Sequence, residues 1–140
     1  DEQSVTNMQV LSRVHPFSSV RPARCHLLVA ELAGAVIGYV AYECRQASVA
    51  EPEASFVHLL SLAVAGPWRR MGYGERLLSE ALAAATVDYG DEAATMQLHA
   101  RTDNATARRL YALVGFSEVA LRPNYYATCD GVLLVRDLSR

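Results

Sequence analysis

The sequence predicts a single α/β domain of three layers, in which helices flank a mixed sheet. An apolar strand runs into a glycine-bearing turn that opens directly into a helix, and a second strand–helix–strand unit follows it. The chain has 140 residues, of which 51% are hydrophobic and 20% are charged, a composition typical of one compact domain with a sizeable core. We therefore expect residues 1–140 to form one domain.

The N-terminal segment carries the periodicity of a helix. Four apolar side chains recur there at spacings of three: Val5, Met8, Leu11 and Val14. Because this spacing places them on one face of a helix, we expect a helix over residues 3–14. Pro16 should end it, since proline cannot donate a backbone hydrogen bond.

Three runs that are typical of strands come next. Residues 26–32 and 36–45 are joined across Ala33-Gly34, which predicts a hairpin. Residues 46–54 are polar and contain a proline, so we expect a loop. Residues 55–65 are almost continuously apolar, as expected for a central strand that is covered on both faces.

The second half of the chain alternates helices and strands. A helix over residues 74–88, closed by Gly90, carries one apolar face. That face consists of Leu77, Leu78, Ala81, Leu82 and Ala85. Residues 95–101 then alternate between apolar and polar side chains, which predicts a strand.

The C-terminal part completes the second strand–helix–strand unit. Asp103 or Asn104 can cap a helix that ends at Gly115. Two further strands, over residues 116–122 and 132–138, should flank a loop and close the sheet.

The turn after the apolar strand has the chemistry of a phosphate-binding loop. Its sequence, Arg69-x-x-Gly72-x-Gly74, places a basic residue and two glycines at the start of a helix. Because glycine lets a ligand approach the backbone and the first N–H groups of a helix are unpaired, this loop can hold a pyrophosphate. It is not a Walker loop, since no Gly-Lys-Ser/Thr follows, and it fits a Rossmann fingerprint poorly, because an arginine replaces the first glycine.

A second motif stands downstream, where residues 104–116 read Asn-x-x-Ala, then Leu-Tyr, then Gly-Phe. In this order and spacing the two motifs resemble the GCN5-related N-acetyltransferase (GNAT) superfamily. The resemblance implies acetyl-CoA as co-substrate and a mostly antiparallel mixed sheet, with the family's first strand missing or before Asp1. It assigns acetyl-CoA binding to Leu62, Ala63, Val64, Arg69, Arg70, Met71, Gly72, Tyr73, Gly74, Glu75, Asn104, Ala107, Arg108 and Tyr111.

Three residues are candidates for the catalytic steps, because acetyl transfer to an amine needs a base and a proton donor. By the resemblance Tyr111 gives a proton to the coenzyme A sulfur, although a core aromatic would fit its helical stripe equally well. His99 resembles the histidine of a Leu-His-Val segment that acts as a base, through water, in the catalytic subunits of the N-terminal acetyltransferase NatE. His58 lies where NatE subunits have tyrosine and NatA subunits have histidine, which implies a partner base or a water-holding residue. Taken singly, each histidine could also be an ordinary core or surface residue.

Two segments resemble the peptide-binding loops of N-terminal acetyltransferases. Residues 122–126 resemble a basic-x-Asn-Tyr-Tyr segment that holds the substrate backbone, and residues 15–19 resemble a loop that lines the pocket for the first side chain. The implied substrate-binding residues are Pro16, Phe17, Leu60, Tyr125 and Tyr126.

These observations predict an enzyme that acetylates the α-amino group of proteins or peptides by direct attack. Two alternatives stay open: a GNAT enzyme that acts on a lysine side chain or a small amine, and a non-catalytic subunit that binds acyl-CoA. An auxiliary or ribosome-associated subunit is a possible partner.

Composition excludes other classes of protein and ligand. A formal net charge of −2 argues against a nucleic-acid surface, and the apolar runs are far shorter than the ~20 residues that span a bilayer. The 3 cysteines have no disulfide or zinc spacing, which indicates a reducing, cytoplasmic setting. No histidine pairs with carboxylates at metal-binding spacing, so we expect no metal.

Overall fold

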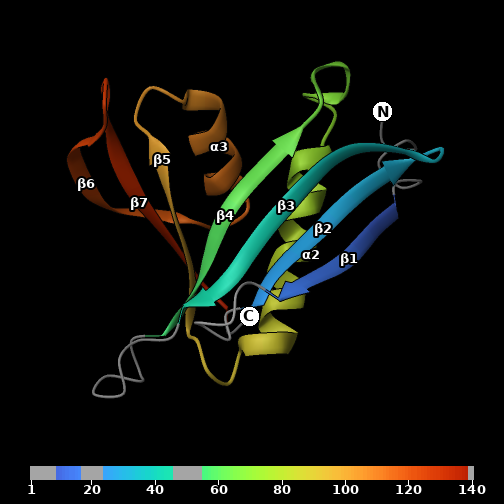
Figure 1. Ribbon diagram of the computed structural model, residues 1–140. Helices are drawn as coiled ribbons and strands as arrows, with labels where there is room; N and C mark the ends of the chain where they lie inside the picture. The colour runs from blue at the N-terminus through green and yellow to red at the C-terminus, as the bar shows by residue number, and fades with distance from the viewer. Residues whose placement is uncertain (1–8, 17–23, 46–54, 139–140) are drawn as a thin grey trace.

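The computed structural model describes residues 9–16, 24–45 and 55–138. Within these residues seven strands form one sheet in the order β1-β2-β3-β4-β5-β7-β6 (Figure 1). The strands are β1 (Gln9–Pro16), β2 (Arg24–Leu32), β3 (Ala35–Arg45), β4 (Phe56–Val64), β5 (Thr95–Arg101), β6 (Ser117–Tyr126) and β7 (Cys129–Asp137). The helices are the short 3-10 turn η2 (Gly66–Trp68), α2 (Tyr73–Tyr89) and α3 (Ala105–Leu113). All strand pairs are antiparallel except β4 with β5.

Strand β1 corrects the prediction of an N-terminal helix. Residues 9–16 pair with β2 in an unbroken antiparallel register from Gln9↔Glu31 to Pro16↔Arg24. The spacing of three does not exclude a strand, and pairing with β2 supplies hydrogen bonds that the local pattern cannot reveal. Pro16 ends this edge strand, where its missing N–H is tolerated. Residues 3–8 of the predicted helix lie outside the described residues, and a further strand before Asp1 stays a prediction.

The hairpin of β2 and β3 is confirmed. Ala33 and Gly34 form the turn with φ values of 52° and 82°, the positive values that a two-residue hairpin turn requires. Gly38 on β3 has a different task. A Cβ there would lie 2.8 Å from the Ala63 carbonyl oxygen and 3.1 Å from Leu77 Cδ1, so glycine lets α2 approach the sheet closely.

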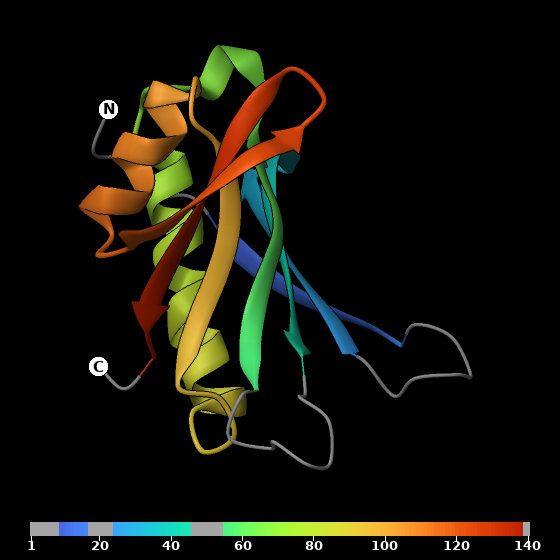
Figure 2. The ribbon, with the colours of Figure 1, turned by 90° about the vertical axis from the view of Figure 1, so that its left-hand side faces the viewer.

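Helices α2 and α3 lie on the same side of the sheet (Figure 2). Helix α2 packs on β2, β3 and β4 through the face that the sequence predicted. The buried residues of α2 are Tyr73, Leu77, Leu78, Ala81, Leu82 and Ala85. The described residues thus form two layers, and they include no helix on the opposite side of the sheet, which we call the open face. Strand β4 is accordingly not covered on both faces, contrary to the prediction from the sequence: Val57 and Leu59 are buried, whereas His58 and Leu60 between and after them are not.

Strands β4 and β5 diverge after a short contact. Their parallel pairing comprises Val57↔Met96 and His58↔Gln97 among the described residues, although β4 continues to Val64 and β5 to Arg101. Figure 1 shows the two strands spreading apart from this point. Strand β4 also carries a bulge at Leu60, because Tyr42 and Ala41 pair with Leu59 and Ser61. The result is a gap between β4 and β5, which widens toward the end of β4.

Candidate active site

The predicted phosphate-binding loop, residues 69–74, lies at the wide end of this gap, and we call it the glycine loop. Gly72 precedes α2 with φ 88°, and the first bond of the helix runs from the Arg76 N–H to the Gly72 carbonyl at 3.1 Å. The N–H groups of residues 73–75 therefore point out of the helix end, where the helix dipole favours an anion. Arg70 also has positive φ, 63°, so the backbone turns sharply just before the helix.

Packing within the chain does not require a glycine at position 74. A Cβ at Gly74 would lie 3.5 Å from Leu110 Cδ2 and 3.8 Å from Val64 Cγ2, both ordinary contacts. Packing within the chain therefore tolerates a side chain here, whereas a ligand approaching the backbone would not. The loop is held in place by Arg69, whose Nε donates to the Val64 carbonyl at 2.9 Å, and by Trp68, which lies edge-on to Tyr73.

The end of β4 offers backbone groups to the gap. Leu62 and Val64 pack against the core, and Ala63 pairs with Tyr39 of β3 on the far side from β5. In the described sheet, residues 60–64 have no strand partner on the β5 side. Backbone amides without a ladder partner can pair with an amide-bearing chain. The predicted acetyl-CoA residues of β4 thus line the gap.

The two candidate histidines share the open face. His58 pairs with Gln97, and His99 follows two residues later on the same face of β5. The His99 ring stacks on Tyr125 at 4.4 Å between centroids and an angle of 12°. Burial, and then the charge of Arg122, lowers the pKa of His99.

His58 has a more mixed environment. Burial, and then Arg45, lowers its pKa, while Glu43 acts in the opposite direction and His99 lowers it further. The pKa values of both histidines therefore lie below the usual value, and the neutral imidazoles that predominate at neutral pH can accept a proton. Neither Glu43 nor Arg45 was predicted as a site residue.

Tyr111 is a core residue as well as a candidate acid. It is 8% exposed and lies edge-on to Phe116 at 5.6 Å. Burial, with a smaller contribution from Tyr126, raises the pKa of Tyr111 to about 12. The phenol therefore keeps its proton at neutral pH, as a proton donor must.

The second motif holds helix α3. Asn104 caps the helix by accepting a hydrogen bond from the Ala107 N–H at 3.1 Å. Arg108 donates to both carboxylate oxygens of Glu118, at 2.9 and 2.8 Å, and to the Thr102 carbonyl at 2.7 Å. These bonds fix α3 against β6, and a role of Asn104 or Arg108 in binding acetyl-CoA stays a prediction.

The positions of Tyr125 and Tyr126 depend on a distortion near the end of β6. The register shifts between Arg122 and Tyr126, and Asn124, with φ 55°, donates its N–H to the Asp130 carboxylate at 2.8 Å. Tyr125 is consequently 51% exposed over His99, and the Arg101 guanidinium lies 5.4 Å from the ring centroid of Tyr126.

The other predicted substrate-binding residues do not gather around Tyr125 and Tyr126. Leu60 is 42% exposed and lies on β4 two residues after His58. Pro16 lies at the end of β1, with β2 and β3 between it and β4. Phe17 lies outside the described residues.

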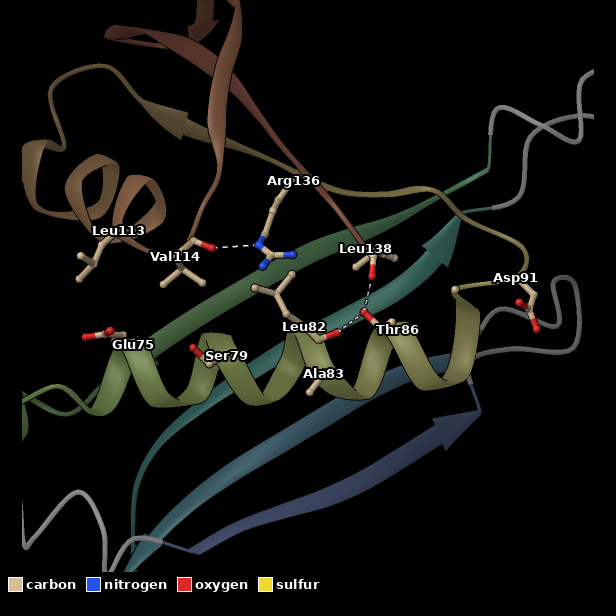
Figure 3. Close-up of a pocket in the computed structure, with 11 residues that line it drawn as sticks. Glu75, Ser79, Leu82, Ala83, Thr86, Asp91, Leu113, Val114, Arg136 and Leu138 are labelled. Carbon is tan, nitrogen blue, oxygen red and sulfur yellow. Dashed lines mark hydrogen bonds between the residues drawn. The ribbon is translucent and has the colours of Figure 1, made fainter. Parts of the chain in front are cut away.

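A separate groove of about 620 Å³ lies on the helix side of the sheet (Figure 3). It is lined by α2, the end of α3 and the end of β7, and Glu75 alone among the predicted site residues borders it. Arg136 crosses it and donates from Nε to the Val114 carbonyl at 2.9 Å. Neither histidine contributes to this groove.

The described residues contain no group of three or more His, Cys, Asp or Glu side chains that could hold a metal ion. No helix among them is long and apolar enough to cross a membrane.

Comparison with known proteins identifies the family. The acetyltransferase (GNAT) family model matches residues 5–116, so the chain belongs to this family. An N-alpha-acetyltransferase of Sulfolobus acidocaldarius is 35% identical over 111 residues, which are 76% of this chain and 65% of that protein. The [ribosomal protein bS18]-alanine N-acetyltransferase of Escherichia coli is 41% identical over 75 residues, 52% of this chain and 47% of that protein.

Solved structures agree on the fold. Ard1 from Thermoplasma volcanium is 28% identical with a TM-score of 0.66, and the match covers 81% of this chain and 71% of that one. Arabidopsis thaliana NAA60, solved in complex with acetyl-CoA, has a TM-score of 0.67 at 20% identity, with 80% and 76% covered. The chain spans between 20% and 65% of the length of four curated relatives that it matches, the Sulfolobus acidocaldarius and Escherichia coli proteins included.

Proposed function

We propose that this protein transfers the acetyl group of acetyl-CoA to the α-amino group of protein or peptide N-termini. The observation that carries the proposal is the placement of His58 and His99, two uncharged bases, on the open face beside the gap that leads to the glycine loop. The relatives named as N-alpha-acetyltransferases support the α-amine as acceptor.

The loop and the end of β4 fit acetyl-CoA. The N–H groups of residues 73–75 would hold the pyrophosphate, and the free edge of residues 62–64 would pair with the amide-bearing arm. When bound, acetyl-CoA supplies the acetyl group as an activated thioester.

The chain's own residues then manage the protons. His99, with His58, takes a proton from the α-ammonium and so exposes the lone pair of the nitrogen. Transfer from an α-amino group to an ordinary imidazole costs about 2 kcal/mol, because their usual pKa values are near 8 and 6.5, and the lowered pKa of His99 adds to this cost. Tyr111 gives its proton to the departing sulfur and regains one from the amine side. Tyr125 stacks on His99 and so narrows the access to this histidine from the open face. A narrow access suits an extended peptide end better than a small amine.

The test is steady-state acetylation of short peptides that differ at residue one, with free or blocked α-amines and with or without lysine. We expect only free α-amines to react, and His99→Ala to lower kcat about 100-fold or more. Gln97→Ala, on the same face of the same strand, is the matched control and should keep most of the activity. Equal reaction of blocked peptides that carry lysine would refute the α-amine assignment. Binding of coenzyme A without any turnover would favour the non-catalytic reading.

The setting of the enzyme follows from its proposed substrate. Nascent and ribosomal proteins are presented in the cytoplasm, which suits three cysteines that are all free in the structure. One relative is named for a ribosomal protein, which supports a ribosomal or ribosome-associated partner.

A further inference from the structure

Glu43 stands directly beside His58 on the open face. The two residues are partners in the β3–β4 register, and Glu43 Oε1 lies 4.0 Å from His58 Nδ1. Both side chains are mostly buried, with 19% of Glu43 and 28% of His58 exposed. His58 Nδ1 itself is buried and has no hydrogen-bond partner among the described residues. The Glu43 carboxylate therefore lies near a ring nitrogen whose hydrogen-bonding capacity is otherwise unused.

Arg45 fixes the carboxylate. Its Nε donates to the same Oε1 of Glu43 at 2.9 Å, so the oxygen that faces His58 is held in place. The charged and titratable groups that act on His58 are Glu43 and Arg45 from β3 and His99 from β5, while Arg122 of β6 acts on His99. Glu43 alone among them favours a protonated His58.

A carboxylate beside Nδ1 also selects the tautomer. The distance of 4.0 Å is too long for a hydrogen bond, but the negative charge of an ionised carboxylate favours the neutral imidazole that carries its proton on Nδ1. The lone pair then lies on Nε2. A histidine prepared in this way accepts a proton at Nε2 and becomes an imidazolium whose positive charge faces the carboxylate.

We propose that Glu43 is a positioning residue for His58, holding the ring in the Nδ1–H tautomer and stabilising the imidazolium formed during acetyl transfer. The inference rests on the proposed function, because it is the α-ammonium that gives up the proton. The N–H bond of the ammonium breaks as the Nε2–H bond forms, and no proton passes to Glu43. His58 later releases this proton to solvent through its exposed side. His58 is then the member of the His58–His99 pair that stores the proton, and both imidazoles must be uncharged for the pair to accept it.

The experiment compares Glu43→Gln, Glu43→Asp and Arg45→Gln in the full chain. The readouts are the pH dependence of kcat/KM and the ¹⁵N NMR titration of His58 in the free protein. Glu43→Gln should move the acid limb and the His58 titration to lower pH, shift the tautomer toward Nε2–H, and lower kcat on the order of 5-fold with an unchanged peptide KM. Arg45→Gln should move both curves to higher pH, because it removes a cation that opposes protonation. Glu43→Asp should restore much of the loss.

Several outcomes would overturn the inference. An unchanged pH limb and an unchanged tautomer in Glu43→Gln would leave Glu43 without this role. A raised peptide KM at constant kcat would instead show that Glu43 binds the substrate directly. If the wild type acetylates no free α-amine, the proposed function fails, and the NMR titration still decides whether Glu43 controls His58. Circular dichroism confirms that each variant is folded.

Discussion

Replacing Gly131 with alanine should push Tyr125 away from His99. A Cβ at Gly131 would lie 2.9 Å from the Cβ, 3.1 Å from the Cγ and 3.2 Å from the Cδ2 of Tyr125. The first distance is shorter than real Cβ contacts, and these atoms lie at the root of the side chain, so rotation of the phenol end cannot relieve the clash. Tyr125 must shift as a whole, and its stacking on His99 at 4.4 Å is lost.

The size of the effect follows from the cost of overpacking. An extra methyl group in a filled site costs about 1–3 kcal/mol, and the lost ring pair contributes about 0.5–1.5 kcal/mol of that range. For a chain of this length the melting temperature should fall by roughly 4–12 °C. In peptide acetylation we expect a higher KM for the peptide and an unchanged KM for acetyl-CoA, because Tyr125 stacks on His99 and is not part of the glycine loop.

Gly66→Ala is the matched control for this prediction. A Cβ at Gly66 would have nothing within 4 Å, so this variant should melt within about 2 °C of the wild type. Equal melting temperatures for Gly131→Ala and Gly66→Ala, with unchanged peptide KM in both, would refute the reasoning.

Four further substitutions test other parts of the site. Gly72→Ala forces a side chain into φ 88°, so the free energy of unfolding should fall by about 1–2 kcal/mol and the calorimetric Kd for coenzyme A should rise. Arg122→Gln removes a cation that lowers the pKa of His99; because only neutral His99 is a base, the acid limb of kcat/KM should move to higher pH. Arg108→Gln and Glu118→Gln break one partly exposed ion pair, so each should lower the urea midpoint of unfolding only slightly. If Arg108 also binds acetyl-CoA, Arg108→Gln alone should raise the KM for acetyl-CoA.

The parts of the fold that could be predicted are those with local signals. The Ala33-Gly34 turn and the glycine at the start of α2 have their causes within a few residues, and both predictions hold. The N-terminal segment lacks such a signal. Its apolar spacing fits a helix, but pairing with β2 decides the matter, and that partner lies about fifteen residues along the chain.

The site divides in the same way. The loop motif and the two histidines could be found in the sequence, whereas Glu43 could not, because its position beside His58 depends on the register of β3 with β4. That register is altered by the bulge at Leu60, which is not visible as a pattern in the sequence. Gly131 was missed for the same reason, since its neighbour Tyr125 belongs to a distorted segment of β6.

The gap between β4 and β5 explains how one reaction can use residues on both sides of the sheet. Helix α2 begins on the helix side, whereas His58 and His99 lie on the open face, and a continuous ladder would separate them. The hydrogen-bonded ladder stops after His58↔Gln97. The backbone groups of β4 and β5 beyond this pair can therefore hydrogen-bond to a ligand that lies between the two strands, in the plane of the sheet. An arm held there would reach the helix end on one side and the histidines on the other. For the proposed reaction we therefore expect the backbone pairing of the two residue pairs at the closed end to matter, because it keeps His58 and His99 in register while leaving the rest of the gap open.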